Sequence, residues 1–347
     1  MNWLITGGCG FVGTNLADAL LAGGKSIALL DNMSGRGAGE NLRWLRARHG
    51  SDWPMIEADV RDADATAAAV RRYHPQFVAH LAGQVAMTTS LANPRLDFET
   101  NALGTFNVLE AIRLGSPETA MLYSSTNKVY GSLEQLRYDE SPTRYLLVDY
   151  PEGLDESLSL DGSSPYGCSK LSADQCCRDY HRIYGLKTVV FRHSSMYGGR
   201  QFASFDQGWI GWFASESLAA LASGRAISIC GSGKQVRDVL HASDLVRVYL
   251  QAAGRIDEIA GRIYNIGGGM ANSLSLIELL EHLGRLIGTQ LSIELQRWRT
   301  ADQKVFVADC RRAQRDFDWR PQTDFRQGLS EMLDWIRELN RARRGAA

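Results

Sequence analysis

The chain has 347 residues, of which 44% are hydrophobic, and its formal charge is −1. This length predicts one large domain or two fused domains, and the near-neutral charge argues against broad binding to nucleic acid or to membrane surfaces. The six scattered cysteines and seven dispersed histidines predict neither disulfides nor a metal site. No apolar run approaches the roughly 20 residues of a membrane span, and the N-terminus enters a strand without room for a signal peptide. We therefore expect a cytoplasmic protein with no metal and no nucleic-acid or membrane partner.

Strand-like and helix-like patterns alternate in the first half of the chain. The strand-like runs are Trp3–Thr6, Ile27–Asp31, Met55–Asp59, Phe77–Leu81 and Met121–Ser125, and the helix-like stretches are Val12–Ala22, Ala63–Tyr73 and Arg95–Leu114. A further unit follows, with a helix over Tyr166–Tyr184 and a strand over Thr188–Ser194. Alternation of this kind predicts an α/β fold with a Rossmann-type, doubly wound parallel sheet.

The pattern changes after residue 196. Shorter strand-like runs at Ile227–Cys230, Tyr264–Ile266 and Leu291–Leu295 mix with helices near Ser243–Ala253, Leu276–Leu286 and Phe325–Leu339. We expect a sheet domain over residues 1–195 and a smaller α/β region over 196–347 that caps it, from which the chain could cross back to the sheet. The polar stretch 132–162 is longer than a typical loop, which predicts a functional or disordered segment.

A glycine-rich turn follows the first predicted strand. Gly7, Gly10 and Gly13 are spaced Gly-x-x-Gly-x-x-Gly and open a helix, the context in which such a turn holds a dinucleotide pyrophosphate. Asp31 ends the second strand, where its carboxylate can accept from both ribose hydroxyls and would repel a 2′-phosphate. This favours NAD over NADP, although Arg36 nearby keeps NADP open. The alternative is that the glycines only make a tight turn.

Three polar residues in order predict an acid/base site. Thr126 follows the fifth strand, and Tyr166 and Lys170 lie four residues apart, so that they share one face of a helix. An ammonium beside a phenol stabilises the phenolate and lowers the pKa of the tyrosine, as a general base requires. Taken singly, Thr126 could instead be a turn residue and Tyr166 a core residue.

These motifs together resemble the extended short-chain dehydrogenase/reductase family of nucleotide-sugar enzymes over essentially the whole chain. The segments Tyr123–Gly131, Ser164–Lys170, Phe191–Gln201 and Asp206–Trp209 look like those of CDP-tyvelose (CDP-paratose) 2-epimerases within it. Sugar 4,6-dehydratases carry Thr-Asp-Glu where this chain has Thr126-Asn127-Lys128, which argues against dehydration.

The resemblance implies an isomerase with tightly bound NAD. Hydride leaves carbon 2 of a CDP-hexose while Tyr166 removes the hydroxyl proton, the keto sugar turns, and hydride returns to the opposite face. Thr126 orients the substrate, and Lys170 lowers the pKa of Tyr166 and binds the nicotinamide ribose. The resemblance also implies a role in O-antigen (lipopolysaccharide) biosynthesis and a homodimer or homotetramer paired through helices 95–114 and 166–184.

The expected site residues form two sets beyond the catalytic Thr126, Tyr166 and Lys170. The cofactor-binding set is Gly7, Gly10, Phe11, Val12, Gly13, Asp31, Asn32, Asp59, Val60, Leu81, Ala82, Gly83, Asn101, Ser124, Tyr166, Lys170 and His193. The substrate-binding set is Thr126, Asn127, Ser195, Arg200, Gln201, Gln207, Gln235, Arg237, Arg299 and Asp302.

Within the substrate set, Arg237 and Arg299 resemble residues that hold the diphosphate or its ribose, and arginine matches phosphate in a bidentate manner. Either could instead be a solvated surface residue. The aromatic residues Phe202, Phe205, Trp209 and Trp212 either line the base pocket or belong to the core or a subunit contact.

Two other functions remain open at this point. A nucleotide-sugar 4-epimerase of the same family would share the cofactor, Tyr166 and Lys170, but would take hydride from carbon 4. A non-catalytic dinucleotide-binding regulator would keep the glycines, but such proteins commonly lose the tyrosine or the lysine.

Overall fold

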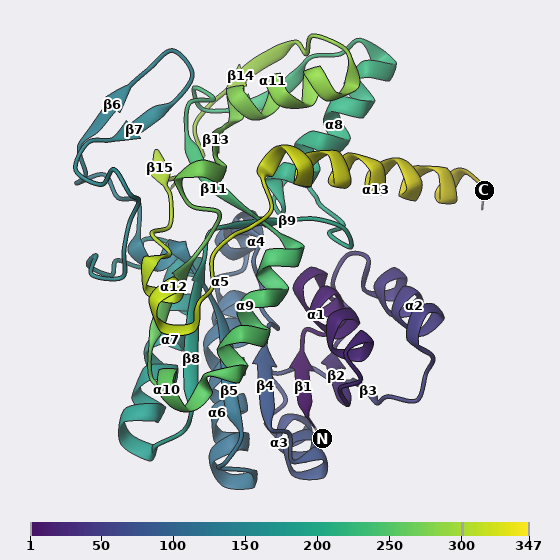
Figure 1. Cartoon of the computed structure of the whole chain (residues 1–347), viewed down its shortest axis with the longest axis vertical. Coiled ribbons are helices and arrows are strands. Elements are labelled where there is room, and N and C mark those ends of the chain that lie inside the picture. The colour runs from purple at the N-terminus through teal and green to yellow at the C-terminus, as the bar shows by residue number, and fades with distance from the viewer. Residues whose placement is uncertain (1, 300–301, 346–347) are drawn as a thin grey trace.

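The computed structural model describes residues 2–299 and 302–345. Its centre is a seven-stranded sheet in the order β12-β8-β5-β4-β1-β2-β3, in which every neighbouring pair is parallel (Figure 1). The strands are β1 (Trp3–Thr6), β2 (Ile27–Asp31), β3 (Met55–Glu57), β4 (Phe77–His80), β5 (Ala120–Thr126), β8 (Thr188–His193) and β12 (Ile263–Ile266). The predicted α/β class with a doubly wound parallel sheet is confirmed.

Helices cover both faces of this sheet because successive side chains of each buried strand point to opposite sides. In β1, Trp3 and Ile5 join the core on one face, and Leu4 joins the core on the other. The first face is covered by α1 (Phe11–Ala22), α2 (Ala38–His49), α9 (Ala242–Gly254), α10 (Ile256–Ile259) and α12 (Arg311–Phe317). The second face is covered by α3 (Ala63–Tyr73), α6 (Gly104–Gly115) and α7 (Pro165–Tyr184).

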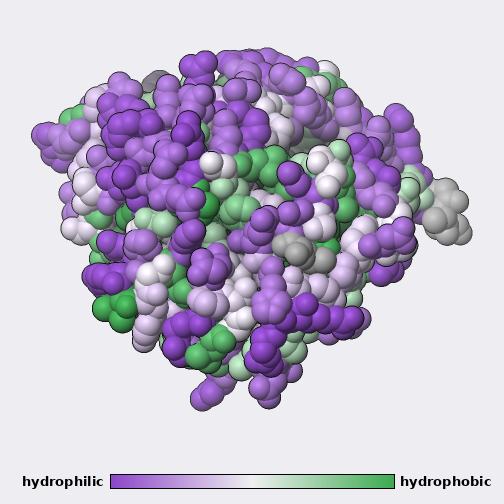
Figure 2. Space-filling model, turned by 60° about the horizontal axis from the view of Figure 1, so that its bottom comes forward, coloured by the Kyte–Doolittle hydropathy of each residue, from purple (hydrophilic) through white to green (hydrophobic). Residues whose placement is uncertain are grey.

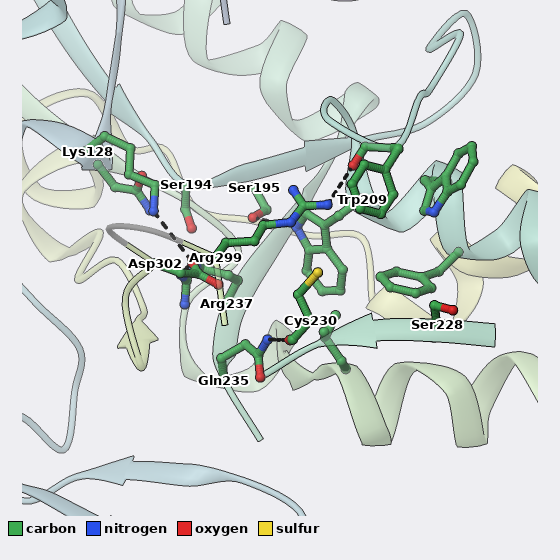
Figure 3. Close-up of a pocket in the computed structure, with 15 residues that line it drawn as sticks. Lys128, Ser194, Ser195, Trp209, Ser228, Cys230, Gln235, Arg237, Arg299 and Asp302 are labelled. Atoms are coloured by element: carbon green, nitrogen blue, oxygen red, sulfur yellow. Dashed lines mark hydrogen bonds and ion pairs between the residues drawn. The ribbon is translucent and has the colours of Figure 1, made fainter. Parts of the chain in front are cut away.

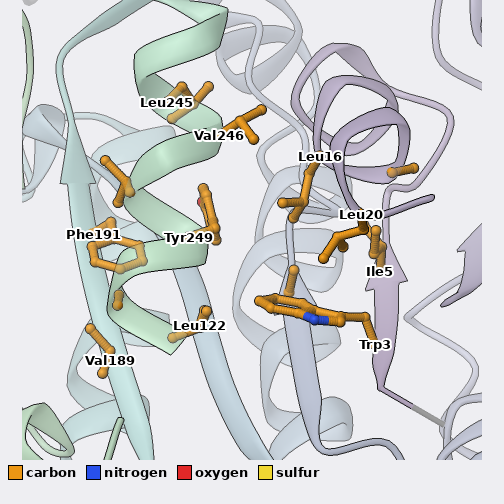
Figure 4. Packing of buried hydrophobic residues seen from close by; sticks show 14 of the residues in the cluster. Trp3, Ile5, Leu16, Leu20, Leu122, Val189, Phe191, Leu245, Val246 and Tyr249 are labelled. Carbon is orange, nitrogen blue, oxygen red and sulfur yellow. The ribbon is translucent and has the colours of Figure 1, made fainter. Parts of the chain in front are cut away.

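Part of the region after residue 196 belongs to the central sheet and its helical cover, whereas the sequence led us to expect mainly a cap over the sheet. β12 pairs with β8 at one edge of the sheet, and α9 packs on the sheet, with the rings of Tyr249 and Phe191 5.2 Å apart (Figure 4). The sequence suggested a capping role for these elements because a short apolar run does not indicate which sheet it joins. The boundary at residue 195 stays a prediction.

A second layer lies beyond the carboxyl ends of the parallel strands (Figure 1). Its helices, α8 (Trp209–Ser223), α11 (Leu276–Ile287) and α13 (Phe325–Gly345), pack around a separate apolar core. Its strands are β9 (Ser195–Tyr197), β10 (Ile227–Cys230), β11 (Val236–His241), β13 (Ser273–Ser275), β14 (Ile293–Gln296) and β15 (Val305–Phe306). This layer therefore covers the sheet edge at which ligands bind in open α/β folds.

The segment 132–162, expected to be functional or disordered, is partly folded. It contains the hairpin of β6 (Tyr138–Glu140) and β7 (Tyr145–Leu147). Arg144 beside β7 donates from Nε to Glu278 of α11 at 2.8 Å, and Leu154 forms a bridge with Ala308. These partners lie more than 130 residues away along the chain, so the local sequence pattern did not reveal them.

The helix expected over Arg95–Leu114 is present in three parts. After α4 (Met87–Ala92), the chain forms α5 (Pro94–Phe98), a π-helical turn over Glu99–Leu103, and α6. A single π turn inside a helix often marks a functional position, because it rotates the side chains that follow. This turn carries Asn101, one of the predicted cofactor residues.

Polar side chains cover most of the outer surface. Figure 2 shows a face dominated by hydrophilic residues, with hydrophobic residues in small groups between them. Among the helices of the described residues, none combines the length and apolar character that crossing a membrane requires.

Candidate active site

The glycine-rich turn packs tightly between β1 and β4. Gly7 has φ +68°, and a Cβ there would lie 2.7 Å from the backbone nitrogen of Ala82. A Cβ on Gly13 would lie 2.3 Å from the carbonyl oxygen of Gly7. Gly10 caps the N-terminus of α1, followed by Phe11 and Val12 in its first turn. The turn therefore has no room for a side chain at residues 7 and 13, and it directs the start of α1 at the carboxyl edge of the sheet, where an anion is favoured.

Asp31 lies beside this turn at the end of β2. Its carboxylate accepts from the backbone nitrogens of Cys9 at 2.9 Å and Met33 at 2.8 Å, and burial raises its pKa. These two bonds fix the carboxylate at the position predicted for ribose recognition. Asn32, the next residue, donates to Asp59 at 2.8 Å.

Asp59 is held by a cation of the chain. Arg61 donates to both of its oxygens, at 3.0 and 2.9 Å, and this hydrogen bonding lowers the pKa of Asp59 to about 2. Val60 packs against Gly104, where a Cβ would lie 2.7 Å from a Val60 methyl carbon. The role predicted for Asp59 and Val60 beside an adenine stays a prediction.

The three predicted catalytic residues come together at the junction of β5 and α7. Ser164 caps α7 by accepting from the backbone nitrogen of Gly167 at 3.0 Å, and Pro165 occupies the first helical turn. This start places Tyr166 and Lys170 one turn apart. The side chain of Thr126, the last residue of β5, lies close enough to that of Tyr166 to lower its pKa.

Lys170 is anchored against β5. Its Nζ donates to the carbonyl oxygen of Ser124 at 2.6 Å and lies 4.4 Å from the ring centroid of Tyr123. Burial lowers the pKa of Lys170 to about 8. The lysine therefore remains mainly charged at neutral pH, but its proton is held more loosely than that of a surface lysine.

The pKa of Tyr166 differs from the sequence expectation. Burial raises it to about 12, while the neighbouring Thr126 side chain opposes that rise and the charge of Asp97 adds to it. Helical spacing predicted the pairing but could not weigh desolvation against charge, and here desolvation dominates.

The end of β4 borders the same site. Leu81 and Ala82 follow the strand, and a Cβ on Gly83 would lie 3.0 Å from Oδ1 of Asn101 and 3.9 Å from Nζ of Lys170. These contacts bring part of the predicted cofactor set beside the catalytic residues. They leave little space for any side chain at residue 83.

His193 ends β8 and is buried. Its Nε2 lies 3.1 Å from the Tyr249 hydroxyl, and burial lowers its pKa to about 3. The Nδ1 atom is buried without a hydrogen-bond partner among the described residues. His193 is therefore neutral and is suited to position a neighbour rather than to exchange protons near neutral pH.

A cavity of about 240 Å³ lies between the end of β5, where Asn127 and Lys128 follow Thr126, and the second layer. Figure 3 shows its lining side chains converging from β9, β10, β11, α8 and the segment around Arg299. The lining residues are Asn127, Lys128, Ser194, Ser195, Phe205, Trp209, Trp212, Phe213, Ser228, Cys230, Gln235, Arg237, Leu276, Arg299 and Asp302. The cavity thus combines an aromatic wall with a cationic one.

The cationic wall is organised around Asp302. Arg237 donates to its Oδ1 at 2.7 Å, and the Nζ of Lys128 lies 3.7 Å from the same oxygen. Burial lowers the pKa of Lys128 to about 8, and the charge of Arg237 adds to this effect. Arg299 lies 4.3 Å from the ring centroid of Phe205. Three cations and one carboxylate leave this wall with a net positive charge, which favours an anionic ligand.

Six of the ten predicted substrate residues line the cavity. They are Asn127, Ser195, Gln235, Arg237, Arg299 and Asp302. Gln235 donates to the carbonyl of Cys230 at 2.7 Å, and Ser195 accepts from Nε1 of Trp209 at 2.9 Å.

The other predicted substrate residues lie outside this lining. The guanidinium of Arg200 lies 4.3 Å from the ring centroid of Trp44 and 5.9 Å from that of Trp335. Gln201 donates to the carbonyl of Met196 at 3.0 Å, and Gln207 forms backbone bonds with Ser204. Thr126 lies at the catalytic end. Substrate contact by Arg200, Gln201 and Gln207 therefore has no support from the cavity and stays a prediction.

Sequence reasoning left several lining residues out of the substrate set. Lys128 was noted only as part of a motif, although the available signal was its place directly after Thr126 and Asn127, which were predicted as catalytic and substrate-binding. Of the four aromatic residues left undecided, Phe205, Trp209 and Trp212 line the cavity, whereas Phe202 packs on Trp335 with ring centroids 5.5 Å apart. The spacing of these four aromatic residues in the sequence does not distinguish the three that line the cavity from Phe202.

Comparisons with known proteins agree with this geometry. The family model of GDP-mannose 4,6 dehydratase matches residues 4–332. A CDP-paratose 2-epimerase of Salmonella typhi is 48% identical over 98% of this chain and 100% of its own length.

Two solved structures show the same fold in related enzymes. A UDP-glucose 4-epimerase of Thermotoga maritima, solved with UDP-glucose, has a TM-score of 0.82 and 27% identity, covering 98% of this chain and 100% of its own. The dTDP-glucose 4,6-dehydratase DesIV of Streptomyces venezuelae, solved with NAD, has a TM-score of 0.79 and 28% identity, covering 97% of both chains.

Proposed function

This chain belongs to the GDP-mannose 4,6-dehydratase-like family of extended short-chain dehydrogenases/reductases, and from that premise we propose that it is a nucleotide-sugar epimerase. Its reaction inverts carbon 2 of a CDP-hexose, of the CDP-paratose to CDP-tyvelose type, by transient oxidation with tightly bound NAD. The observation that carries the proposal is the full-length similarity to the Salmonella typhi CDP-paratose 2-epimerase. The site supports it with a tyrosine, a lysine and a threonine, and with a cationic cavity whose lining begins at Asn127, directly after that threonine.

The chain's own residues fit NAD. The turn around Gly7 and Gly13 leaves no space for a Cβ, so a pyrophosphate can approach the backbone closely. The buried carboxylate of Asp31 retains acceptor capacity for ribose hydroxyls and disfavours a 2′-phosphate. Lys170 and Asn101 would lie at the nicotinamide end. We propose the remaining predicted cofactor residues as the border of this same groove.

Thr126, Tyr166 and Lys170 each have a separate role in the proposed reaction. NAD, when bound, accepts hydride from carbon 2 and later returns it. Thr126 holds the carbon-2 hydroxyl, and Tyr166 takes its proton as hydride leaves. Lys170 places a positive charge beside the phenolate that receives this proton. After the keto sugar has turned, Tyr166 gives the proton back, so the residues return to their starting states.

The cavity supports a nucleotide diphosphate as the part of the substrate that anchors it. Arg237, Lys128 and Arg299 outweigh Asp302 in charge, and arginine can bind phosphate oxygens in a bidentate manner. Phe205 and the neighbouring tryptophans offer aromatic faces for a base. A substrate held by these groups through its nucleotide leaves the hexose free to turn beside Tyr166.

The proposal can be tested with purified protein in deuterated water without added NAD. CDP-paratose, CDP-glucose and UDP-glucose are supplied separately, and products are followed by proton NMR. Inversion at carbon 2 without solvent deuterium at that carbon is the expected result. Deuterium at carbon 2 would instead indicate deprotonation beside a carbonyl. Inversion of a UDP-sugar at carbon 4 would favour a 4-epimerase, the activity of the structurally similar Thermotoga maritima enzyme.

Tyr166→Phe tests the assigned base. Loss of general-base catalysis should lower turnover by about 10²–10⁴-fold, while the NAD that copurifies with the protein is retained. Tyr73→Phe, at the C-terminal end of α3, is the matched control and should leave turnover unchanged. Full turnover by Tyr166→Phe would remove Tyr166 from the mechanism.

We further propose that two copies pair through α5, α6 and α7 to form a homodimer or part of a homotetramer. These helices expose large apolar side chains, namely Phe98, Leu103, Phe106, Leu114, Ile183 and Tyr184. The six cysteines of the chain are all free thiols, which suits the reducing cytoplasm. A place in lipopolysaccharide O-antigen biosynthesis fits the proposed CDP-sugar product.

A further inference from the structure

A carboxylate without a cation lies behind the catalytic helix. Asp97 of α5 is fully buried. Among the residues that the structure describes, it forms no ion pair, and its oxygens instead accept from Ser169 at 2.5 Å and from Nε2 of Gln84 at 2.7 Å. A buried charge is costly unless hydrogen bonds or an opposite charge offset it. For Asp97 this compensation comes from hydrogen bonds and not from an ion pair.

Asp97 belongs to a closed ring of hydrogen bonds. Nδ2 of Asn101 donates to Oγ of Ser169 at 3.1 Å and to the carbonyl of Gln84 at 2.9 Å. The backbone nitrogen of Gln84 donates to Oδ1 of Asn101 at 2.9 Å. The ring joins the end of β4, the π-helical turn and α7. Within α7, Ser169 lies between Tyr166 and Lys170, so the ring holds the turn that carries both.

Several charged or titratable groups surround the catalytic pair. Burial has the largest influence on both, raising the pKa of Tyr166 and lowering that of Lys170; the charge of Asp97 raises the pKa of Tyr166 and, after Cys177 and Asp174, that of Lys170. The other such groups acting on or near the pair are Tyr123 of β5, Asp174 and Cys177 of α7, His80 of β4 and His193 of β8.

Three of these neighbours, His80, His193 and Asp174, are either neutral or paired with an opposite charge near pH 7. His80 and His193 have pKa values lowered to about 3 by burial and are neutral near pH 7. Asp174 is neutralised by Arg192, which donates to both of its oxygens at 2.8 and 2.9 Å. Asp97 is therefore the buried acid near the pair that forms no ion pair among the described residues, so that its charge acts on Tyr166 and Lys170.

We propose that Asp97 is a positioning residue of the reaction: through Ser169 it fixes the turn between Tyr166 and Lys170, and its charge sets the pH range in which the pair works. This inference rests on the proposed function, because it assigns Tyr166 as the base and Lys170 as its cationic partner. A tyrosine carries charge when deprotonated and a lysine when protonated, so a nearby anion moves both titrations toward higher pH. Asp97 thereby keeps Lys170 charged in a site where burial favours loss of its proton.

The test compares Asp97→Asn with Ser169→Ala. The first variant removes the charge but keeps groups that can hydrogen-bond, and the second keeps the charge but removes the link. We measure kcat/KM of the NAD-loaded enzyme as a function of pH. In Asp97→Asn the whole pH profile should move toward lower pH, by about one pH unit for the loss of one nearby charge. Ser169→Ala should lower kcat/KM at every pH without moving the profile. Circular dichroism and thermal melting establish that each variant is folded.

The outcomes separate this inference from the proposed function. No epimerisation by the parent enzyme would refute the proposed function itself. An active parent with an unmoved profile in Asp97→Asn would overturn the role of Asp97 alone. If Asp97→Asn does not fold, Asp97→Ser removes the same charge with a smaller side chain. Failure of both to fold, beside a folded Ser169→Ala, would make Asp97 a structural residue and would also overturn the inference.

Discussion

Replacing Arg192 with methionine should destabilise the protein by about 3–5 kcal/mol, since it leaves a buried carboxylate without its cation. Arg192 and Asp174 both have fully buried side chains, and their two hydrogen bonds are 2.8 and 2.9 Å long. Arg192 also donates to the Tyr130 hydroxyl at 2.9 Å. Only weaker partners, such as Ser125 at 3.1 Å, would remain for Asp174.

A double-variant cycle measures this magnitude. Urea unfolding followed by circular dichroism gives the free energy of unfolding for the parent, for Arg192→Met, and for Arg192→Met combined with Asp174→Leu. Because the double variant removes both charges, it should recover at least about 2 kcal/mol relative to Arg192→Met alone. A loss below about 1 kcal/mol in Arg192→Met, or a double variant less stable than the single one, would refute the reasoning.

Two further predictions concern the glycine turn and a second buried acid. Gly13→Ala should destabilise the protein by about 1–3 kcal/mol and weaken NAD binding in a fluorescence titration, because its Cβ would lie 2.3 Å from a backbone oxygen. In the control Gly39→Ala the added Cβ meets no atom within 4 Å, so stability and NAD binding should stay unchanged. Unaltered NAD affinity in Gly13→Ala would contradict the tight turn. Burial raises the pKa of Asp238 from 3.8 to about 6, so its protonation stabilises the fold below about pH 4 and that contribution is lost as pH rises through 6. Asp238→Asn should flatten the dependence of unfolding free energy on pH between 4 and 6 in urea titrations, and an unchanged slope would show that Asp238 does not titrate there.

The sheet could be predicted because its strands carry strong local signals. Trp3–Thr6 and Ile27–Asp31 are short apolar runs followed by turn residues, and both are strands with the predicted bounds. α2 was not predicted, because its helix is largely polar and buries only Ala38, Asn41 and Leu45. The hairpin in 132–162 depends on partners such as Glu278 that are remote along the chain. Local pattern therefore finds elements that bury a continuous stripe and misses those held by distant contacts.

The same limit applies to the site. Gly7, Asp31 and the Tyr166–Lys170 spacing lie within local motifs, so their arrangement follows from strand–turn–helix geometry. Arg200 and Arg237 look alike in sequence, but Arg200 stacks on Trp44 while Arg237 reaches Asp302 in the cavity. Their different positions arise from the packing of the second layer, which no spacing in the sequence encodes.

The surroundings of Asp97 could not be predicted from the sequence, because they depend on tertiary contacts. In the sequence it is an ordinary acid near the start of a predicted helix, a position that usually faces solvent. The π-helical turn after it places Asn101 on Ser169, and the hydrogen bond from Ser169 then closes over the Asp97 carboxylate. Asp174 and Asp97 both raise the pKa of Lys170, but Asp174 is paired with Arg192, whereas Asp97 forms no ion pair among the described residues. The pH range of the catalytic pair therefore depends on ion pairing across three separate chain segments, and only the folded structure reveals which acid is left unpaired.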